Sequence, residues 1–108
     1  MVGKVFKVVF SPKARRRLNQ IADYLEKVAS KTVARKVRNN ILEAADKLKS
    51  LPKSKPILPD TEDVRFEVRY TKSYSYKLIF RIEMTDDTVR ILNISHDAED
   101  PDKIISGL

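Results

Sequence analysis

The only histidine of the chain, His96, stands where an apolar run ends and an acidic run begins, in the stretch ILNISHDAEDP of residues 91–101. Imidazole is the side chain best suited to exchanging protons near neutral pH, so His96 is a candidate general acid or base. A histidine at a strand end also serves a structural role when its ring nitrogens bond to a neighbouring loop. The sequence leaves both roles open.

A second constellation is cationic. Arg65 and Arg69 alternate on one predicted strand, and Lys77 and Arg81 alternate on the next. If both sets lie on the side of the sheet away from the helices, four cations converge there. Such a cluster can hold a phosphodiester and stabilise the charge that builds during its cleavage. The alternative is a solvated face on which glutamates of the same strands neutralise the cations.

Aromatic side chains recur along the same two strands, at Tyr70, Tyr74, Tyr76 and Phe80. Tyrosine and phenylalanine rings can stack on nucleic-acid bases. The period-two spacing of Tyr76 and Phe80 favours a place in the core beneath the helices instead.

The elements that would position these residues follow from the hydrophobic pattern. Residues 4–10 are β-branched and aromatic, which predicts a strand. Ser11 and Pro12 then suit the cap and first turn of a helix. The first helix carries one apolar stripe, made of Ala14, Leu18, Ile21, Ala22, Leu25 and Val28. After a break at residues 30–32, a second helix carries another stripe that ends near Leu51, made of Val33, Val37, Ile41, Ala45 and Leu48.

The second half of the chain predicts a β-meander. Three prolines within residues 52–59 predict an extended loop. The strict alternation of residues 64–70 predicts a half-buried strand, and the nearly continuous apolar run at 88–95 predicts a strand covered on both faces. The remaining predicted elements are a strand at 74–83, a turn at 84–87 and a short helix at 101–108.

The predicted order is therefore β-α-α-β-β-β with a short C-terminal helix, within a single domain of residues 1–108. We predict an α+β fold of two layers, in which an antiparallel helical hairpin packs on a four-stranded, mostly antiparallel sheet. The first strand must join the same sheet to hide its apolar side chains.

Composition excludes several kinds of site. The 108 residues contain no cysteine and one histidine, so we expect no disulfide, no zinc site and no cofactor. Gly3 and Gly107 are the only glycines, which excludes a glycine-rich phosphate loop. We find no signal peptide or membrane-spanning run, and the lack of cysteine suits the cytoplasm.

The net charge of +7 is unevenly distributed along the chain. Residues 13–55 hold thirteen Lys or Arg against four acids, a local balance of +9. A basic block of this kind attracts polyanions or an acidic protein segment. The alternative is a solvated helical surface with no partner.

Order and spacing of the motifs SPKA, SYKLIFRI, TVRILNISH and DAEDP resemble those of the ParE/RelE superfamily, the toxins of bacterial type II toxin–antitoxin systems. The resemblance covers roughly residues 4–103. It implies a cognate antitoxin whose C-terminal segment wraps around the toxin, and assembly as a homodimer or as a hetero-oligomer with that antitoxin. ParE-like members inhibit DNA gyrase and are associated with plasmid stabilization. RelE-like members are metal-independent mRNA interferases that cut messenger RNA on the ribosome.

For a RelE-like endoribonuclease, the resemblance implies a catalytic set of Arg65, Lys77, Arg81 and His96. The chain departs from that pattern. A lysine, Lys77, stands where such toxins have an arginine after the tyrosine, and residues 101–108 contain no tyrosine.

The long helical hairpin is typical of the ParE-like branch, and so is a last strand that closes with a histidine followed by acidic residues, here His96 and Asp100. The sequence therefore favours a ParE-like gyrase inhibitor, in which His96 anchors the strand end and the final helix. The alternatives are a RelE-like endoribonuclease and a non-toxic, partner-binding domain of the same fold.

Overall fold

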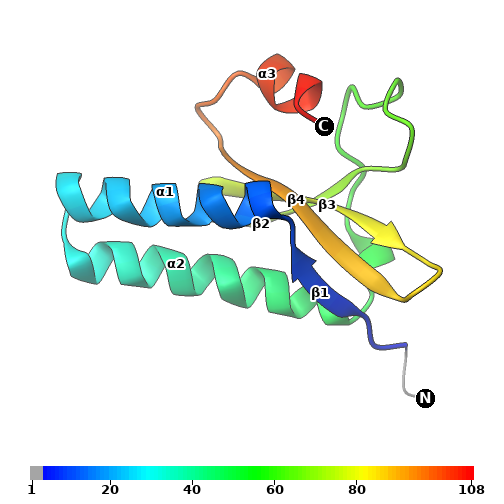
Figure 1. The fold of residues 1–108 in the computed structure, drawn as a ribbon, viewed down its shortest axis with the longest axis horizontal. Helices are drawn as coiled ribbons and strands as arrows, with labels where there is room; N and C mark the ends of the chain where they lie inside the picture. The colour runs from blue at the N-terminus through cyan, green and yellow to red at the C-terminus, as the bar shows by residue number, and fades with distance from the viewer. Residues whose placement is uncertain (1–3) are drawn as a thin grey trace.

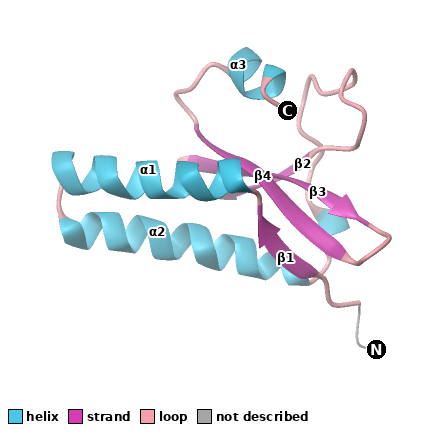
Figure 2. Cartoon of the chain, in the orientation of Figure 1, coloured by secondary structure: helices cyan, strands magenta, loops and turns pink. Residues whose placement is uncertain are grey.

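The structure, a computed structural model, describes residues 4–108. Residues 1–3, which the single-domain prediction includes, lie outside the described residues. Two helices pack on a four-stranded sheet and a short third helix follows, which confirms the predicted α+β fold (Figures 1 and 2). The elements are β1 (Lys7–Phe10), α1 (Pro12–Val28), α2 (Lys31–Asp46), β2 (Arg69–Ser73), β3 (Tyr76–Glu83), β4 (Thr88–His96) and α3 (Pro101–Ser106).

The sheet has the strand order β1-β4-β3-β2, so the first strand joins the meander beside the last one. β1 runs parallel to β4, while the β4–β3 and β3–β2 pairs are antiparallel. This mixed sheet matches the prediction that all four strands share one sheet. The parallel pair follows from the connection after α2, which returns the chain to the end of the sheet at which β1 begins, where Ser50 bridges to Val5. β2 and, after the meander, β4 therefore run in the same direction as β1.

Serine caps begin both long helices. The Ser11 hydroxyl accepts a hydrogen bond from the Ala14 N–H at 3.1 Å, with Pro12 in the first turn, as predicted. The Ser30 hydroxyl accepts from the Val33 N–H at 3.1 Å in the same way. Each cap satisfies a backbone donor that has no partner within its helix. The two caps fix where the hairpin begins and where it turns.

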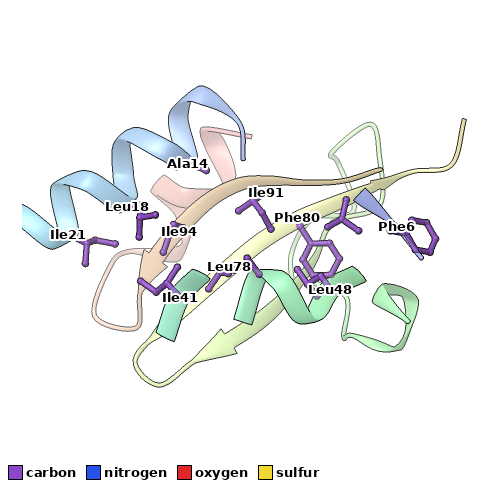
Figure 3. Packing of buried hydrophobic residues seen from close by; sticks show 12 residues of the cluster. Phe6, Ala14, Leu18, Ile21, Ile41, Leu48, Leu78, Phe80, Ile91 and Ile94 are labelled. Atoms are coloured by element: carbon purple, nitrogen blue, oxygen red, sulfur yellow. The ribbon is translucent and has the colours of Figure 1, made fainter. Parts of the chain in front are cut away.

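The main core lies between the helical hairpin and one face of the sheet, which we call the helix face (Figure 3). Its side chains alternate along the strands and recur at helical spacing on α1 and α2. The buried members are Phe6, Ala14, Leu18, Ile21, Ile41, Ala45, Leu48, Leu78, Phe80, Val89, Ile91 and Ile94. The predicted stripes therefore face the sheet.

The two stripes are exposed where α1 and α2 meet at the tip of the hairpin. Val28 is 59% exposed and Val33 is 40% exposed, because the tip of the hairpin extends past the end of the sheet (Figure 1). The prediction that the whole of each stripe is buried is wrong at these two residues. Ala34 is buried in place of Val33. Within residues 4–108, no helix has the length and apolar composition needed to cross a membrane.

A bulge in β4 explains its unbroken apolar run. Ile79 pairs with Asn93 while the next residue, Phe80, pairs with Ile91, so Leu92 is an extra residue on β4. The bulge places both Ile91 and Ile94 in the main core although they are three residues apart. The opposite face of β4 is also buried, as predicted, but there it presents polar side chains such as Asn93.

The strand predicted at 64–70 is wrong in its position, because β2 is Arg69–Ser73. The residues before it cross the opposite face of the sheet, which we call the far face, without pairing as a regular strand. Val64, Phe66 and Val68 pack there with Ile79 in a second apolar cluster. A segment lying over a sheet also buries alternate side chains, so its pattern is the same as that of a strand.

The β2–β3 turn is also displaced from its predicted place. Tyr74 and Ser75 form the two-residue connection, so β3 starts at Tyr76. Tyr74 has φ 54° and is 80% exposed, in contrast to its predicted place on the apolar face of a strand. The turn lacks the Asn or Gly that marks such a connection in a sequence.

The connection between α2 and β2 differs from the predicted extended loop. α2 ends at Asp46, before the predicted end near Leu51, and a 3₁₀ turn follows at Lys47–Lys49. Pro52–Ser54 then form a second 3₁₀ turn, because proline is tolerated in the first turn of a helix. Residues 55–59 are extended and pair briefly with β2 through an Ile57–Arg69 bridge.

Removing a core ring is expected to destabilise the fold strongly. Phe80 is fully buried, so Phe80→Ala should lower the free energy of unfolding by about 3–5 kcal/mol through lost burial and the remaining cavity. Urea denaturation followed by circular dichroism measures this change. Ile57→Ala is the control, because Ile57 is 53% exposed and its loss should cost about 1 kcal/mol or less. Equal losses for both variants would contradict the described core.

Candidate functional site

A cavity of about 200 Å³ opens on the far face, between the sheet, the loop after Leu58 and helix α3. Its apolar walls come from Leu58, Ile79 and the two isoleucines of α3, and its polar walls come from β3 and the end of β4. The lining residues are Leu58, Pro59, Asp60, Lys77, Ile79, Ser95, His96, Asp97, Glu99, Pro101, Ile104 and Ile105. In this cavity the basic side chain of Lys77 lies among apolar residues such as Ile79 and acidic residues such as Asp97.

Lys77 is the cation of this cavity. It lies on β3 directly opposite Ser95 of β4 and next but one to Ile79, so its side chain is on the far face, as predicted. Its ammonium lies 5.2 Å from the centre of the Tyr70 ring, a cation–π contact. Tyr70 therefore orients Lys77 while leaving its hydrogen-bond donors available.

His96 is on the opposite side of the sheet from Lys77. It pairs with Tyr76, and their rings meet edge to face with centroids 5.2 Å apart. Tyr76 packs on the main core, which places both rings on the helix face. The Nδ1 atom of His96 accepts a hydrogen bond from the Ala98 N–H at 3.0 Å. The ring therefore holds the turn that follows β4, which is the structural role considered for it above.

Burial raises the pKa of the Tyr76 phenol, and the nearby Arg17 guanidinium opposes this only in part. Tyr76 therefore stays protonated at neutral pH and has the character of a core residue with a polar tip. This matches the expectation from its period-two spacing.

Glu99 ties the end of β4 to the first helix. Its carboxylate forms an ion pair with Arg17 of α1 and accepts the backbone N–H of His96 at 2.9 Å. The same arginine donates from Nε to the Ile94 carbonyl at 3.1 Å. Asp100 then caps α3 by accepting the Asp102 N–H at 3.0 Å. This network fixes the chain between β4 and α3, and with it one wall of the cavity.

A second acidic residue of the same turn, Asp97, borders the cavity and bonds to β2. The Lys72 ammonium donates to its carboxylate at 2.7 Å, and this hydrogen bond lowers the pKa of Asp97. Lys72 is thereby drawn toward the far face, next to Lys77, with which it pairs across the strands. The negative charge of Asp97 offsets part of the repulsion between the Lys72 and Lys77 ammonium groups.

Arg81 follows Lys77 by four residues on β3, so its side chain is on the same face, as predicted. Its guanidinium carbon lies 4.4 Å from the centre of the Phe66 ring. Glu83 lies between two arginines: its carboxylate is 3.6 Å from Arg81 and 3.0 Å from Arg90. The hydrogen bond from Arg90 lowers the pKa of Glu83. Arg81 thus shares one glutamate with Arg90, so its charge is offset only in part, in the manner of the alternative considered for the sheet cations.

The other two predicted cations do not join this face. Arg65 is exposed on the segment that precedes β2, outside any strand. Arg69 pairs with Phe80, so it starts on the helix face, and its guanidinium contacts Glu67 and the Lys55 carbonyl. The predicted convergence of four cations is therefore wrong. The reason is that Val68 and Tyr70 pack with Ile79 on the far face, so Arg69 between them points to the helix face.

The resulting site can bind but has few means of proton transfer. Of the four residues proposed for catalysis, Lys77 and His96 border the cavity, and the His96 ring is turned to the helix face. Sequence reasoning missed Arg17 and Lys72. Arg17 lies beside the apolar stripe of α1, three residues after Ala14 and four before Ile21. This position is the sequence signal that distinguishes it from the two preceding arginines.

A family model and several solved structures match this chain. The family model described as ParE toxin of type II toxin-antitoxin system, parDE, matches residues 8–101. The chain belongs to the ParE toxin family. It is a toxin of the type II toxin–antitoxin class within the ParE/RelE superfamily. Comparison with curated protein sequences gives no match.

Solved structures share the fold of this ParE-family chain. The chromosomal ParDE system from P. aeruginosa superimposes with a TM-score of 0.71 at 20% identity, covering 87% of this chain and 98% of that one. The toxin–antitoxin complex RelBE2 from Mycobacterium tuberculosis gives 0.62 at 22% identity, covering 88% and 94%. The archaeal RelE–RelB complex from Pyrococcus horikoshii OT3 gives 0.58 at 12% identity, covering 89% and 99%. The same two-layer arrangement thus occurs in ParE and RelE toxins alike.

The Glu83 cluster predicts a pH-dependent contribution to stability. The pKa of Glu83 is lowered in the folded protein, so its contribution is present above the unfolded carboxyl pKa of about 4.3 and is lost as the pH falls through the folded value. Glu83→Gln should lower the unfolding free energy by about 0.5–1 kcal/mol at pH 7. The difference from the parent chain should shrink below about pH 4. Thermal unfolding at pH 7 and pH 3.5 measures both values, and an unchanged difference would contradict this account.

The tether between Arg17 and Glu99 predicts an effect on α3 beyond the stability of the core. Glu99→Gln removes the charge and should loosen residues 97–106, because the ion pair with α1 and the acceptor for His96 are both weakened. Hydrogen exchange of the amides of α3 should speed up about tenfold, while exchange in α1 and α2 should stay as in the parent chain. Glu43→Gln is the matched control, since Glu43 forms an exposed ion pair with Lys47 on α2, away from α3.

Proposed function

We propose that this ParE-family toxin acts by binding, as a non-enzymatic inhibitor of DNA gyrase that an antitoxin neutralises in the bacterial cytoplasm. The observation that carries this proposal is the sidedness of the sheet. Lys77 is on the far face, the His96 ring is on the helix face, and Arg65 is outside the strands. General acid–base chemistry on a phosphodiester needs its acid, its base and its charge-stabilising cations around one reacting group.

The family match supports the same direction. The model that matches most of the chain is that of the ParE toxin of parDE systems. The proposed anchoring role of His96 agrees with this assignment, because its Nδ1 atom is already used by the Ala98 N–H and its ring is packed on Tyr76. We expect a ring held in this way to stabilise the end of β4 rather than to transfer a proton.

An antitoxin is the partner that the related structures favour. Those structures are described as ParDE and RelBE toxin–antitoxin assemblies. The net charge of +7 on this chain suits an acidic partner segment. We therefore expect neutralisation by the product of a neighbouring reading frame.

Expression of the chain alone in a bacterium tests this proposal. We expect growth arrest with induction of the DNA-damage response, and we expect Lys77→Ala and His96→Ala to retain it, since neither side chain would take part in bond cleavage. Inhibition of purified gyrase in a supercoiling assay is the direct measurement. Arrest with cleaved messenger RNA, abolished by Lys77→Ala, would instead establish a RelE-like endoribonuclease. Normal growth would indicate a non-toxic partner-binding domain.

A further inference from the structure

A groove runs between α1 and α2 on the side of the hairpin that faces away from the sheet; we call it the hairpin groove. The two helices lie side by side and pack on the sheet through their apolar stripes, so their other sides are open to solvent (Figure 1). The groove has a volume of about 410 Å³. Its lining residues are Ala22 and Glu26 of α1 with Lys31, Ala34, Arg35, Arg38 and Asn39 of α2.

Positive charge dominates the hairpin groove. On α2 three of its cations follow one another at spacings of four and three residues, which places them on one side of the helix. On α1 an arginine precedes Ala22 by seven residues, or about two turns, and so lies on the same side as Ala22. These four exposed residues, which we call the groove cations, are Arg15, Lys31, Arg35 and Arg38.

The groove cations have no acidic partner in the chain itself. Within residues 4–108, no carboxylate oxygen lies within 4.0 Å of any of them. Glu26, the one acidic residue among those described that line the groove, also forms no ion pair there. The arginines that are paired are found elsewhere, as Arg17 with Glu99, Arg69 with Glu67, and Arg81 and Arg90 with Glu83.

This arrangement works against the stability of the hairpin. Lys31 and Arg35 are four residues apart on α2, and Arg35 and Arg38 are three residues apart, so each pair places like charges on neighbouring turns. Like charges at these spacings destabilise a helix by a few tenths of a kcal/mol per pair. The fold alone therefore gives no reason for three cations in this row, whereas an anion bound between the helices would relieve their repulsion.

The chemistry of the groove suits phosphate. Guanidinium groups donate two parallel hydrogen bonds to phosphate oxygens, and three of the four groove cations are arginines. Asn39 lines the groove, and Asn19 lies four residues after Arg15 on the same side of α1. Asparagine amides also donate to phosphate oxygens in complexes with nucleic acids.

The groove does not suit a protein segment or a single strand. Protein interfaces depend on buried aromatic and large apolar anchors, and the apolar lining here is limited to Ala22 and Ala34. Single strands bind by stacking their bases on aromatic rings. Tyr24 is two residues from both Ala22 and Glu26, so its ring lies on another side of α1. A double helix, whose bases are stacked inside and whose phosphates are outside, needs no such ring.

The spacing of the groove cations also agrees with a duplex. Lys31 and Arg38 are about 10 Å apart along α2 at 1.5 Å per residue. This length corresponds to about three phosphates of one strand, which succeed one another every 3.4 Å or so along the duplex axis. The three cations of α2 can therefore meet successive phosphates, with Arg15 placed on the neighbouring helix.

We propose that the hairpin groove binds the phosphate backbone of double-helical DNA without reading its sequence. The groove cations contact phosphate oxygens, and Asn19 and Asn39 donate further hydrogen bonds to the backbone. This DNA contact goes beyond the gyrase inhibition proposed above and does not depend on it. In a gyrase inhibitor, it would hold the toxin on the DNA on which gyrase acts.

Salt dependence of binding is the first test. The probe is a fluorescently labelled duplex of mixed sequence and about 20 base pairs, followed by anisotropy. Four phosphate contacts should make the logarithm of the association constant fall against the logarithm of salt concentration with a slope of about −3.6. The Kd should be in the micromolar range at about 50 mM salt. Absence of binding at this salt with about 100 μM protein would overturn the proposal.

Neutralising the α2 cations is the second test. The double variant Arg35→Gln/Arg38→Gln should raise the Kd by about tenfold or more and reduce the slope by about 1.8. Its melting temperature should stay at or above that of the parent, because glutamine is a good helix former and like charges are removed. Lys53→Gln/Lys103→Gln is the matched control, since it removes the same charge from exposed residues outside the groove. Its Kd should stay within about threefold, and equal losses for both variants would contradict a localised site.

Removing the acidic residue of the groove is a test in the opposite direction. Glu26→Gln should lower the Kd for the duplex about threefold, because its carboxylate repels phosphate. Glu62→Gln makes the same charge change at an exposed residue of the loop before β2 and should have a smaller effect. A Kd that Glu26→Gln leaves unchanged or raises would count against the groove as the binding site.

Competition identifies the class of ligand. An unlabelled duplex should displace the probe at lower concentration than a single strand of the same length, and polyglutamate of equal charge should displace it poorly. Displacement by the single strand or by polyglutamate at the same or lower concentration would overturn the duplex proposal.

Gyrase assays separate this inference from the proposed function. Duplex binding with the expected slope and variant effects, without inhibition of supercoiling, would support the DNA site and contradict the gyrase proposal. Inhibition of supercoiling by a chain that binds no duplex would support the gyrase proposal and overturn the DNA site.

Discussion

Alternation of side chains across a sheet with both faces covered is the constraint on which the rest of this structure depends. The helix face takes the apolar side chains that the hairpin buries, and it takes the Tyr76 and His96 rings with them. The far face takes Lys77 and Arg81, beneath the segment before β2 and beside α3. Residues adjacent in sequence, such as Tyr76 and Lys77, therefore meet different partners. This separation keeps Lys77 and Arg81 apart from the Tyr76 and His96 rings.

The two ends of the chain are held together by few but specific contacts. Arg17 joins α1 to the Ile94 carbonyl and to Glu99, and Glu99 in turn accepts the His96 N–H. Charge-assisted bonds of this type are stronger than neutral ones and more directional. They position α3, which is too short to be stable alone and contributes Ile104 to the apolar cluster on the far face. The cavity around Lys77 exists because this tether holds α3 over the sheet edge.

Surface features that the monomer does not need point to partners. The tip of the helical hairpin leaves Val28 and Val33 exposed, and the β2–β3 turn exposes Tyr74. Val33 and Tyr74 line one hollow together with Lys36, which forms no ion pair within residues 4–108. A protein that functions alone gains stability by replacing such residues with polar ones. Their presence is consistent with a chain that spends its time in complexes.

The sequence by itself determined the fold class and the direction of most side chains. The serine caps, the two helical stripes and the alternating runs predict a helical hairpin on a four-stranded sheet, and the family resemblance rests on the same order of motifs. These signals are local, since caps and periodicity act within a few residues of the chain. Lys77 and Arg81 were placed on the correct face for this reason.

Tertiary structure alone decided which charged residues meet. The start of β2, the bulge at Leu92 and the turn at Tyr74 depend on strand pairing between residues far apart in the chain, and each has a pattern that another structure shares equally well. Packing of Val68 and Tyr70 on the far face turned Arg69 to the helix face, and the late start of β2 left Arg65 outside the sheet. Because one residue of register exchanges the two faces, the sequence could propose four converging cations, but only the assembled sheet could separate them.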